Sequence, residues 1–216
     1  MRHSYIIISK QAYTELIVRS DYARMNCRYI YLVFTRTGTW VSRLIHVFSE
    51  IKYAHSSLSF DNNFTKMYSF GRIKPENPFS GGFVEENLYD GVYKKFSNCE
   101  CLIYKVRVTE EQYLFLQEQV DVFLREKEKY RYNFIGLFGV LLNVPIKRNR
   151  HYFCSQFVSE ILIKSNIFSS EKTPELIRTN ELYAIENKEI IYEGVINQGC
   201  LSQKDVLFGP LPLYQG

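Results

Sequence analysis

The sequence predicts an α+β domain, on the basis of its composition and of the order of its patterns. Of 216 residues, 46% are hydrophobic and 23% charged, as in globular chains with one sizeable core. Runs rich in β-branched and aromatic residues cluster in the first half, and helical spacing of apolar residues predominates in the second. No repeat or Pro/Gly-rich linker interrupts residues 1–216, so we expect a single domain.

The predicted strands are short apolar runs bounded by turn residues. Residues 28–35 (RYIYLVFT) form one strand, and 101–108 (CLIYKVRV) form another. Segments 55–60 and 65–70 flank Asp61-Asn62-Asn63, which favours a hairpin. Residues 71–82 are predicted to be a loop. At the N-terminus a strand at 5–9 and a helix at 11–24 are expected, within an addition that covers residues 1–27.

Four segments have the spacing of amphipathic helices: 40–48, 110–128, 134–142 and 153–164. Thr109, followed by acidic residues and Gln112, predicts the capped start of the second. The run 134–144 (FIGLFGVLLNV) is shorter than the roughly 20 residues that cross a bilayer. We interpret it as a buried helix or as the wall of an apolar channel. Beyond Asn180 the pattern is irregular, and residues 183–216 are expected to be a C-terminal extension.

Charge and cysteine content narrow the class of protein. The net charge of +4 comes from interspersed residues of both signs, 27 basic and 23 acidic, which does not indicate nucleic acid binding.

Five cysteines without regular spacing, and no apolar leader, predict a reducing, cytoplasmic setting. No transmembrane segment is predicted, and peripheral membrane contact stays open. Cys99-Glu-Cys101 lacks a second ligand pair, so neither a metal nor another cofactor is expected.

Cys154 and His55 are the candidate catalytic pair. Cys154 lies in the first turn of a predicted helix, where free amides and the helix dipole favour a thiolate. His55 lies in a predicted strand among small residues, where its imidazole has room to approach a partner. Taken singly, each also fits a structural role, Cys154 as a small core residue and His55 as a satisfied strand histidine. His151, three residues before Cys154, is a competing base.

Several segments together resemble a known family. These are HSSLSFD from His55, MYSFGR from Met67, Tyr132-Asn133, and FCSQFV from Phe153. They are similar to the permuted papain-like cysteine hydrolases of the YaeF/YiiX group, relatives of NlpC-type peptidases and lecithin-retinol acyltransferases. The resemblance covers residues 28–182 as a papain-like core. It implies a circularly permuted papain-like fold, with an antiparallel sheet packed against helices and the histidine strand preceding the cysteine helix.

The resemblance also implies roles for further residues. The family's third catalytic residue is a polar side chain on the strand after the histidine strand, often glutamate or histidine. Here that strand offers Ser69, which we expect to orient His55, with Tyr68 turned into the core or toward substrate. Glu85 is an alternative, interpreted otherwise as a solvated acid. Tyr132 matches a family tyrosine near the oxyanion, which makes it a second candidate substrate-binding residue.

The function expected from this resemblance is cysteine-dependent hydrolysis of an amide or ester, as in an amidase or peptidase, through an acyl-enzyme on Cys154. The alternative enzyme is an acyltransferase on lipid or N-acyl substrates. A further alternative, favoured by the absence of a predicted triad acid, is a non-catalytic binding module. The expected partner is a small-molecule, peptide or lipid-like acyl substrate, and the high aromatic share of 16% favours a partly apolar one.

Overall fold

A computed structural model describes residues 27–37, 51–73, 80–96 and 98–196 of the chain. The strand predicted at 5–9 and the helices predicted at 11–24 and 40–48 lie outside these ranges. All other predicted elements can be compared with the structure.

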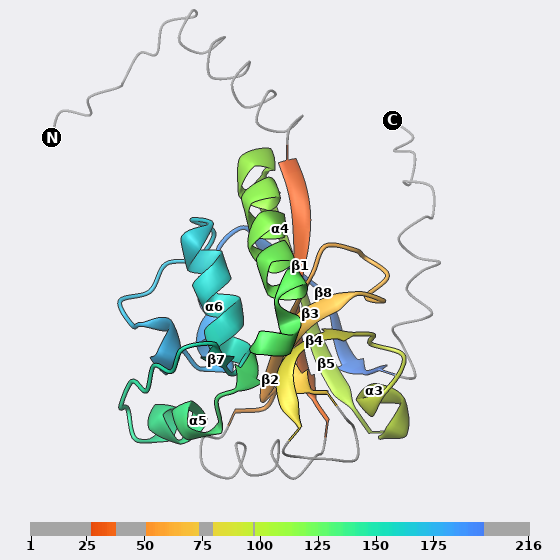
Figure 1. The fold of residues 1–216 in the computed structure, drawn as a ribbon. Coiled ribbons are helices and arrows are strands. Elements are labelled where there is room, and N and C mark those ends of the chain that lie inside the picture. Colours follow the sequence, from red (N-terminus) through yellow and green to blue (C-terminus); the bar gives the residue numbers. More distant parts are fainter. Residues whose placement is uncertain (1–26, 38–50, 74–79, 97, 197–216) are drawn as a thin grey trace, which may run out of the picture.

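The centre of the fold is a six-stranded antiparallel sheet with strand order β4-β3-β2-β1-β5-β8 (Figure 1). Together with the helices it confirms the predicted α+β class. Strands β2 and β3 form the predicted hairpin, in which Leu58 pairs with Tyr68. The strands are β1 (Cys27–Arg36), β2 (His55–Ser59), β3 (Met67–Arg72), β4 (Gly81–Glu86), β5 (Glu100–Thr109) and β8 (Lys188–Val195).

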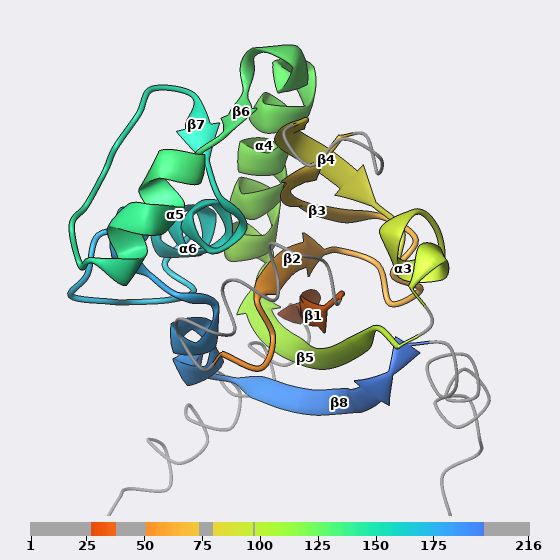
Figure 2. The same ribbon diagram turned by 90° about the horizontal axis from the view of Figure 1, so that it is seen from below.

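Helices α4 and α6 lie on one face of the curved sheet, and α3 lies beyond its other side (Figure 2). The predicted cap of α4 is confirmed, because Thr109 Oγ1 accepts a hydrogen bond from the Gln112 amide at 3.1 Å. The helices are α3 (Val92–Lys95), α4 (Glu110–Arg125), α5 (Phe134–Leu141) and α6 (Cys154–Lys164), with 3₁₀ turns η1 (Lys127–Lys129), η2 (Pro174–Leu176) and η3 (Thr179–Ala184). A two-residue parallel pair joins β6 (Arg131–Tyr132) to β7 (His151–Tyr152).

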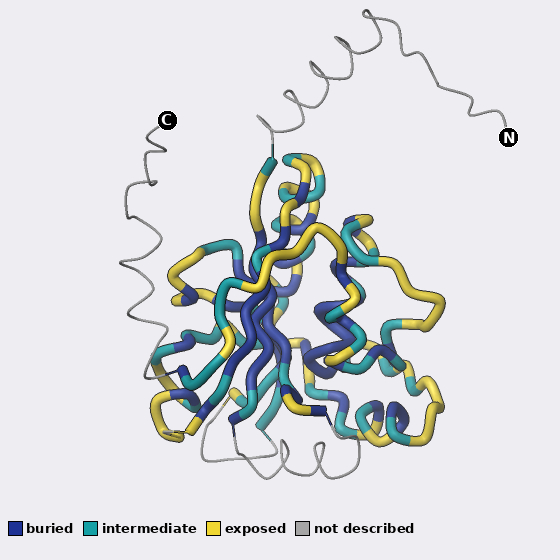
Figure 3. The backbone as a smooth tube through the Cα atoms, turned by 180° about the vertical axis from the view of Figure 1, so that it is seen from behind, coloured by how far each residue is buried: buried dark blue, intermediate teal, exposed yellow. Residues whose placement is uncertain are grey.

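Both faces of the sheet are covered, which explains why the middle of β1 is buried without alternation (Figure 3). On the helical face, Phe34 and Phe70 pack with Phe157 of α6 in the larger of two apolar clusters. On the other face, Val33 packs in a smaller cluster with Tyr93 of α3. This second cluster brings α3 close to the strands that carry the candidate site.

The structure departs from the predicted elements in three places. Residues 71–82 are not wholly a loop, because β3 continues to Arg72 and β4 begins at Gly81. Helix α5 is not a buried helix, since Phe138 is 56% exposed. The sheet continues beyond the core boundary predicted at residue 182, because β8 pairs with β5. Pairing with a neighbouring strand decided the first and third outcomes, and local composition does not report it.

The aromatic cluster under α6 gives a test of this core. Phe157 is fully buried, and its ring centroid lies 4.9 Å from that of Phe123 and 5.5 Å from that of Phe70. We expect Phe157→Ala to lower the free energy of unfolding by about 3–5 kcal/mol, through lost burial and a residual cavity. Phe138→Ala on exposed α5 is the control and should change it by less than about 0.5 kcal/mol. Urea denaturation measures both, and equal losses would contradict this packing.

Candidate active site

Cys154 is the first residue of α6, as predicted, and its side chain is buried at 3% exposure. The preceding strand β7 runs directly into the helix, and α6 packs against β2 and β3. The Cys154 thiol faces the start of β2, with Sγ 3.8 Å from the carbonyl oxygen of Ala54. The residue after Ala54 is His55, so the sheet and the helix start bring the two predicted catalytic residues together.

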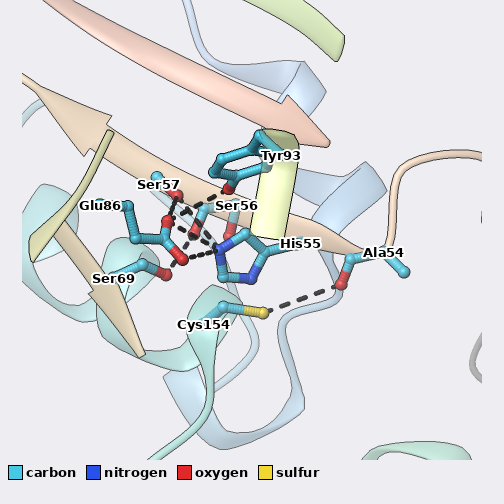
Figure 4. A network of polar contacts seen from close by, with 8 residues as sticks. All are labelled: Ala54, His55, Ser56, Ser57, Ser69, Glu86, Tyr93 and Cys154. Carbon is cyan, nitrogen blue, oxygen red and sulfur yellow. Dashed lines mark hydrogen bonds and ion pairs between the residues drawn. The ribbon is translucent and has the colours of Figure 1, made fainter. Parts of the chain in front are cut away.

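His55 lies between Cys154 and a carboxylate (Figure 4). Its Nε2 is 3.0 and 3.1 Å from the two carboxylate oxygens of Glu86, the last residue of β4. Its other ring nitrogen, Nδ1, is on the side of the ring that faces the Cys154 sulfur (Figure 4). The side chains of His55 and Glu86 are only 19% and 17% exposed. This is the arrangement of a nucleophile, a base and an orienting acid.

Two further hydroxyl groups hold the Glu86 carboxylate. Ser57 Oγ donates a hydrogen bond to Glu86 Oε2 at 2.7 Å, and the Tyr93 hydroxyl donates to the same oxygen at 3.3 Å. Gly71 of β3 leaves room for His55 and Glu86 to meet. A Cβ at this position would lie 3.1 Å from Glu86 Oε1 and 3.7 Å from His55 Cε1. The absence of a side chain on the strand between β2 and β4 lets the ion pair form across it.

The electrostatics of the site favour a thiolate and an imidazolium. Burial alone would lower the pKa of His55, but the charge of Glu86 and the contact with Cys154 outweigh it and raise that pKa well above its usual value. Burial alone would raise the pKa of Cys154, yet the hydrogen bond and charge of His55 lower it, and the amides of Ser56 and Ser155 add to this. Burial alone would raise the pKa of Glu86, but the charge of His55 and the hydrogen bonds from His55, Ser57 and Tyr93 together lower it.

Tyr132 lies beside the nucleophile, where the sequence placed a substrate-binding residue. Pairing of Tyr132 with Tyr152, two residues before Cys154, brings β6 next to the start of α6. Burial, followed by the nearby Cys154, raises the pKa of the Tyr132 hydroxyl well above its usual value. This hydroxyl therefore stays protonated at neutral pH and can donate a hydrogen bond to an oxygen near Sγ.

The expectation for the third catalytic residue is corrected. Ser69 does not orient His55: its Oγ donates a buried hydrogen bond to the Ser56 carbonyl at 2.7 Å, while Glu86 holds the imidazole. Glu85, the alternative considered, is exposed and pairs across the sheet with Tyr68. Successive residues of a strand face opposite sides, so Glu86 turns to His55 and Glu85 turns away. A predicted strand at Gly81–Glu86 would have shown that Glu85 and Glu86 face opposite sides and that only one of them can reach His55.

The structure also places the other candidate residues around the site. Tyr68 packs against the larger cluster, and its ring centroid lies 6.1 Å from that of Phe60 and 6.4 Å from that of Phe83. This position agrees with the expected place in the core rather than with a substrate-binding role. His151 Nδ1 contacts the carbonyl oxygen of Asn149 at 2.7 Å, so a backbone group holds this ring. Gln156, two residues after Cys154 in α6, is buried at 1% exposure.

A small cavity of about 30 Å³ opens beside Cys154. Its walls are mainly apolar and come from α5, the helix start and the segment before β2: Ile51, Ala54, Leu137, Val140, Leu141 and Phe153, with Ser155, Arg178 and Thr179. The predicted wall of an apolar channel thus corresponds to one face of α5. The opposite face of α5 exposes Ile135 and Phe138 to solvent.

Within the described ranges, no cluster of three or more His, Cys, Asp or Glu side chains could hold a metal ion. No described helix is long and apolar enough to cross a membrane. Cys99 and Cys154 are free thiols. Comparison with protein-family models, with curated proteins and with solved structures found no match for this chain.

Glu86 can be tested through the reactivity of the thiol. In Glu86→Gln, loss of the carboxylate lowers the pKa of His55, which removes the imidazolium and raises the pKa of Cys154. We therefore expect alkylation of Cys154 by iodoacetamide at pH 6.5 to slow by about tenfold or more, because only the thiolate reacts. The pH at which the alkylation rate of Cys154 reaches half its maximum should also shift upward.

Glu85→Gln is the matched control, one residue earlier on the exposed face of the same strand. Its alkylation rate should follow the wild-type pH profile. A wild-type profile in Glu86→Gln, or an equal shift in both variants, would contradict the role assigned to Glu86.

Proposed function

We propose that this chain is a cysteine-dependent hydrolase of amides or esters that works through an acyl-enzyme on Cys154. The observation that carries the proposal is the buried series of Cys154, His55 and Glu86, in which the pKa of the thiol is lowered and that of the imidazole is raised. In a buried cysteine without such partners the pKa of the thiol rises instead, as at Cys99, where burial raises it to about 11. Perturbed groups in this geometry are typical of catalytic sites.

The reaction follows from the positions of the groups. Cys154 Sγ attacks the substrate carbonyl carbon and forms a C–S bond, while the carbonyl electron pair moves to its oxygen. The imidazolium of His55 gives its proton to the leaving amine or alkoxide as that bond breaks and a thioester remains. Water then attacks the thioester, with His55 accepting its proton, and the acid leaves as the thiolate is restored. The Tyr132 hydroxyl is a suitable donor to the oxyanion in both halves.

The fold that fits this proposal is the permuted papain-like one. Three observations support it: an antiparallel sheet, a histidine strand that precedes the cysteine helix, and a nucleophile at a helix start. A non-catalytic module was favoured only by the lack of a predicted triad acid, and the pairing of Glu86 with His55 supports the enzyme instead.

An acyltransferase is the second candidate, in which an amine or alcohol replaces water in the second half-reaction. The cavity of about 30 Å³ beside Cys154 has room for only a short acyl chain, and Val140 and Leu141 in its wall favour an apolar one in either reaction. The two reactions differ only in the acceptor, so added ethanolamine or glycine separates them. Transfer of the acyl group to the amine at a rate above hydrolysis would favour the transferase.

Cys154 itself gives the decisive test. With p-nitrophenyl acetate we expect a burst of nitrophenol and one acetyl group on the peptide that contains Cys154, detected by mass spectrometry. Cys154→Ala should abolish both without unfolding the protein, since only a small side chain is removed. Cys99→Ala, at a thiol kept protonated by burial, should retain both. Undiminished turnover in Cys154→Ala would exclude this mechanism.

The two histidines near the nucleophile are expected to differ. His55→Ala removes the base and should slow acylation about a hundredfold or more. It should also raise the apparent pKa of the Cys154 thiol, because the imidazolium no longer favours the thiolate. His151→Ala, at a ring held by a backbone carbonyl, should alter neither. The reverse pattern in burst kinetics would mean that the base is misassigned.

A further inference from the structure

Arg72 lies close to Tyr132 of the candidate site. It is the last residue of β3 and pairs with Gly81 of β4. Residues directly opposite in an antiparallel pair share a face of the sheet. On that face a Cβ at Gly81 would lie 2.6 Å from the Cβ of Tyr132, so the Arg72 side chain leaves the sheet beside Tyr132. The positive charge of Arg72 also acts on Tyr132, where it opposes the rise in the pKa of the hydroxyl.

The Arg72 guanidinium has a buried nitrogen without a partner. Its Nη2 is shielded from solvent and donates a hydrogen bond to no oxygen of the residues that the structure describes. Other arginines differ: Arg28 and Arg150 each pair with a carboxylate, and Arg178 donates to the Val140 carbonyl. A buried, unpaired cationic donor destabilises a protein unless a partner satisfies it. The Arg72 side chain as a whole is only half-buried, so a ligand that reaches the guanidinium can satisfy this donor.

A groove of about 490 Å³ runs past this guanidinium. Arg72 and Glu86 both line it, together with Tyr93 of α3, Leu124 of α4 and Lys127 of η1. The acidic side chains of Glu85, Asp90 and Glu128 also line it, but none of them has an ion pair with Arg72 in the described part of the chain. The groove shares no lining residue with the apolar cavity at Cys154.

We propose that Arg72 is a specificity-determining residue that binds a carboxylate or phosphate carried by the substrate. The proposal rests on the proposed hydrolase or acyltransferase function. A planar guanidinium forms paired hydrogen bonds with such anions. The apolar cavity then receives the acyl side of the scissile bond, and the anionic group lies on the leaving-group side, beyond Tyr132. The substrate class is an acylated acid, such as an N-acyl amino acid or an acyl phosphate ester.

Two alkylating reagents that differ only in charge test the proposal. Iodoacetate and iodoacetamide both form a C–S bond at Cys154 Sγ with loss of iodide, but only iodoacetate carries a carboxylate. We expect the ratio of the iodoacetate rate to the iodoacetamide rate to fall about fivefold or more in Arg72→Gln, because a nearby positive charge is lost. The rates are measured by mass spectrometry of the Cys154 peptide, at constant ionic strength.

Lys127→Gln is the matched control, since it removes a positive charge from the same groove. Its ratio should stay within twofold of wild type. A ratio within twofold of wild type in Arg72→Gln, with Cys154 still alkylated selectively by iodoacetamide, would overturn the role of Arg72 and leave the hydrolase proposal intact. Absence of selective alkylation of Cys154 in the wild-type protein would instead count against the hydrolase proposal.

A measurement on wild-type protein covers the case in which Arg72→Gln does not fold. Inorganic phosphate or acetate, added in place of chloride, should slow iodoacetate at least threefold more than iodoacetamide when the anion occupies the Arg72 site. The more effective of the two anions identifies phosphate or carboxylate as the preferred group. Equal slowing of both reagents by each anion would exclude an anion site beside Cys154.

Discussion

The ion pair between His55 and Glu86 is the interaction on which the candidate site depends. The two residues lie on β2 and β4, which are separated in the sheet by β3. Contact across an intervening strand requires a gap in that strand, and Gly71 provides it. The order and register of three strands are therefore as important to the thiolate as the helix that carries Cys154, because the imidazolium keeps its charge only next to this carboxylate.

Such a pair has an energetic cost that the surroundings offset. Removing two charges from water is unfavourable, and their mutual attraction compensates only when the remaining polar atoms are also satisfied. Ser57 and Tyr93 satisfy the Glu86 carboxylate, and Tyr93 belongs to the cluster on the far face of the sheet. The second apolar cluster thus has a part in the electrostatics of the site, although it lies on the face of the sheet opposite α6.

The sequence was informative where a local pattern fixes the outcome. The β1 strand, the β2–β3 hairpin, the cap of α4 and the position of Cys154 at the start of α6 depend on neighbouring residues, and each agrees with its prediction. Glu86 was missed because Gly81-Gly82 is also typical of a loop, and one residue of register decides which of two adjacent glutamates faces His55. The exposure of α5 and the pairing of β8 depend on long-range packing, which no local pattern reports.

The position of β8 has a consequence for biosynthesis. This strand is the last described strand of the chain, yet it completes the sheet beside β5, which ends some 80 residues earlier at Thr109. While the chain is being translated, the outer edge of β5 has no strand partner until Lys188–Val195 leave the ribosome. Unpaired strand edges are sites of intermolecular association. The nascent chain therefore has an exposed edge from the emergence of β5 until the emergence of β8, even after the helix bearing Cys154 has emerged.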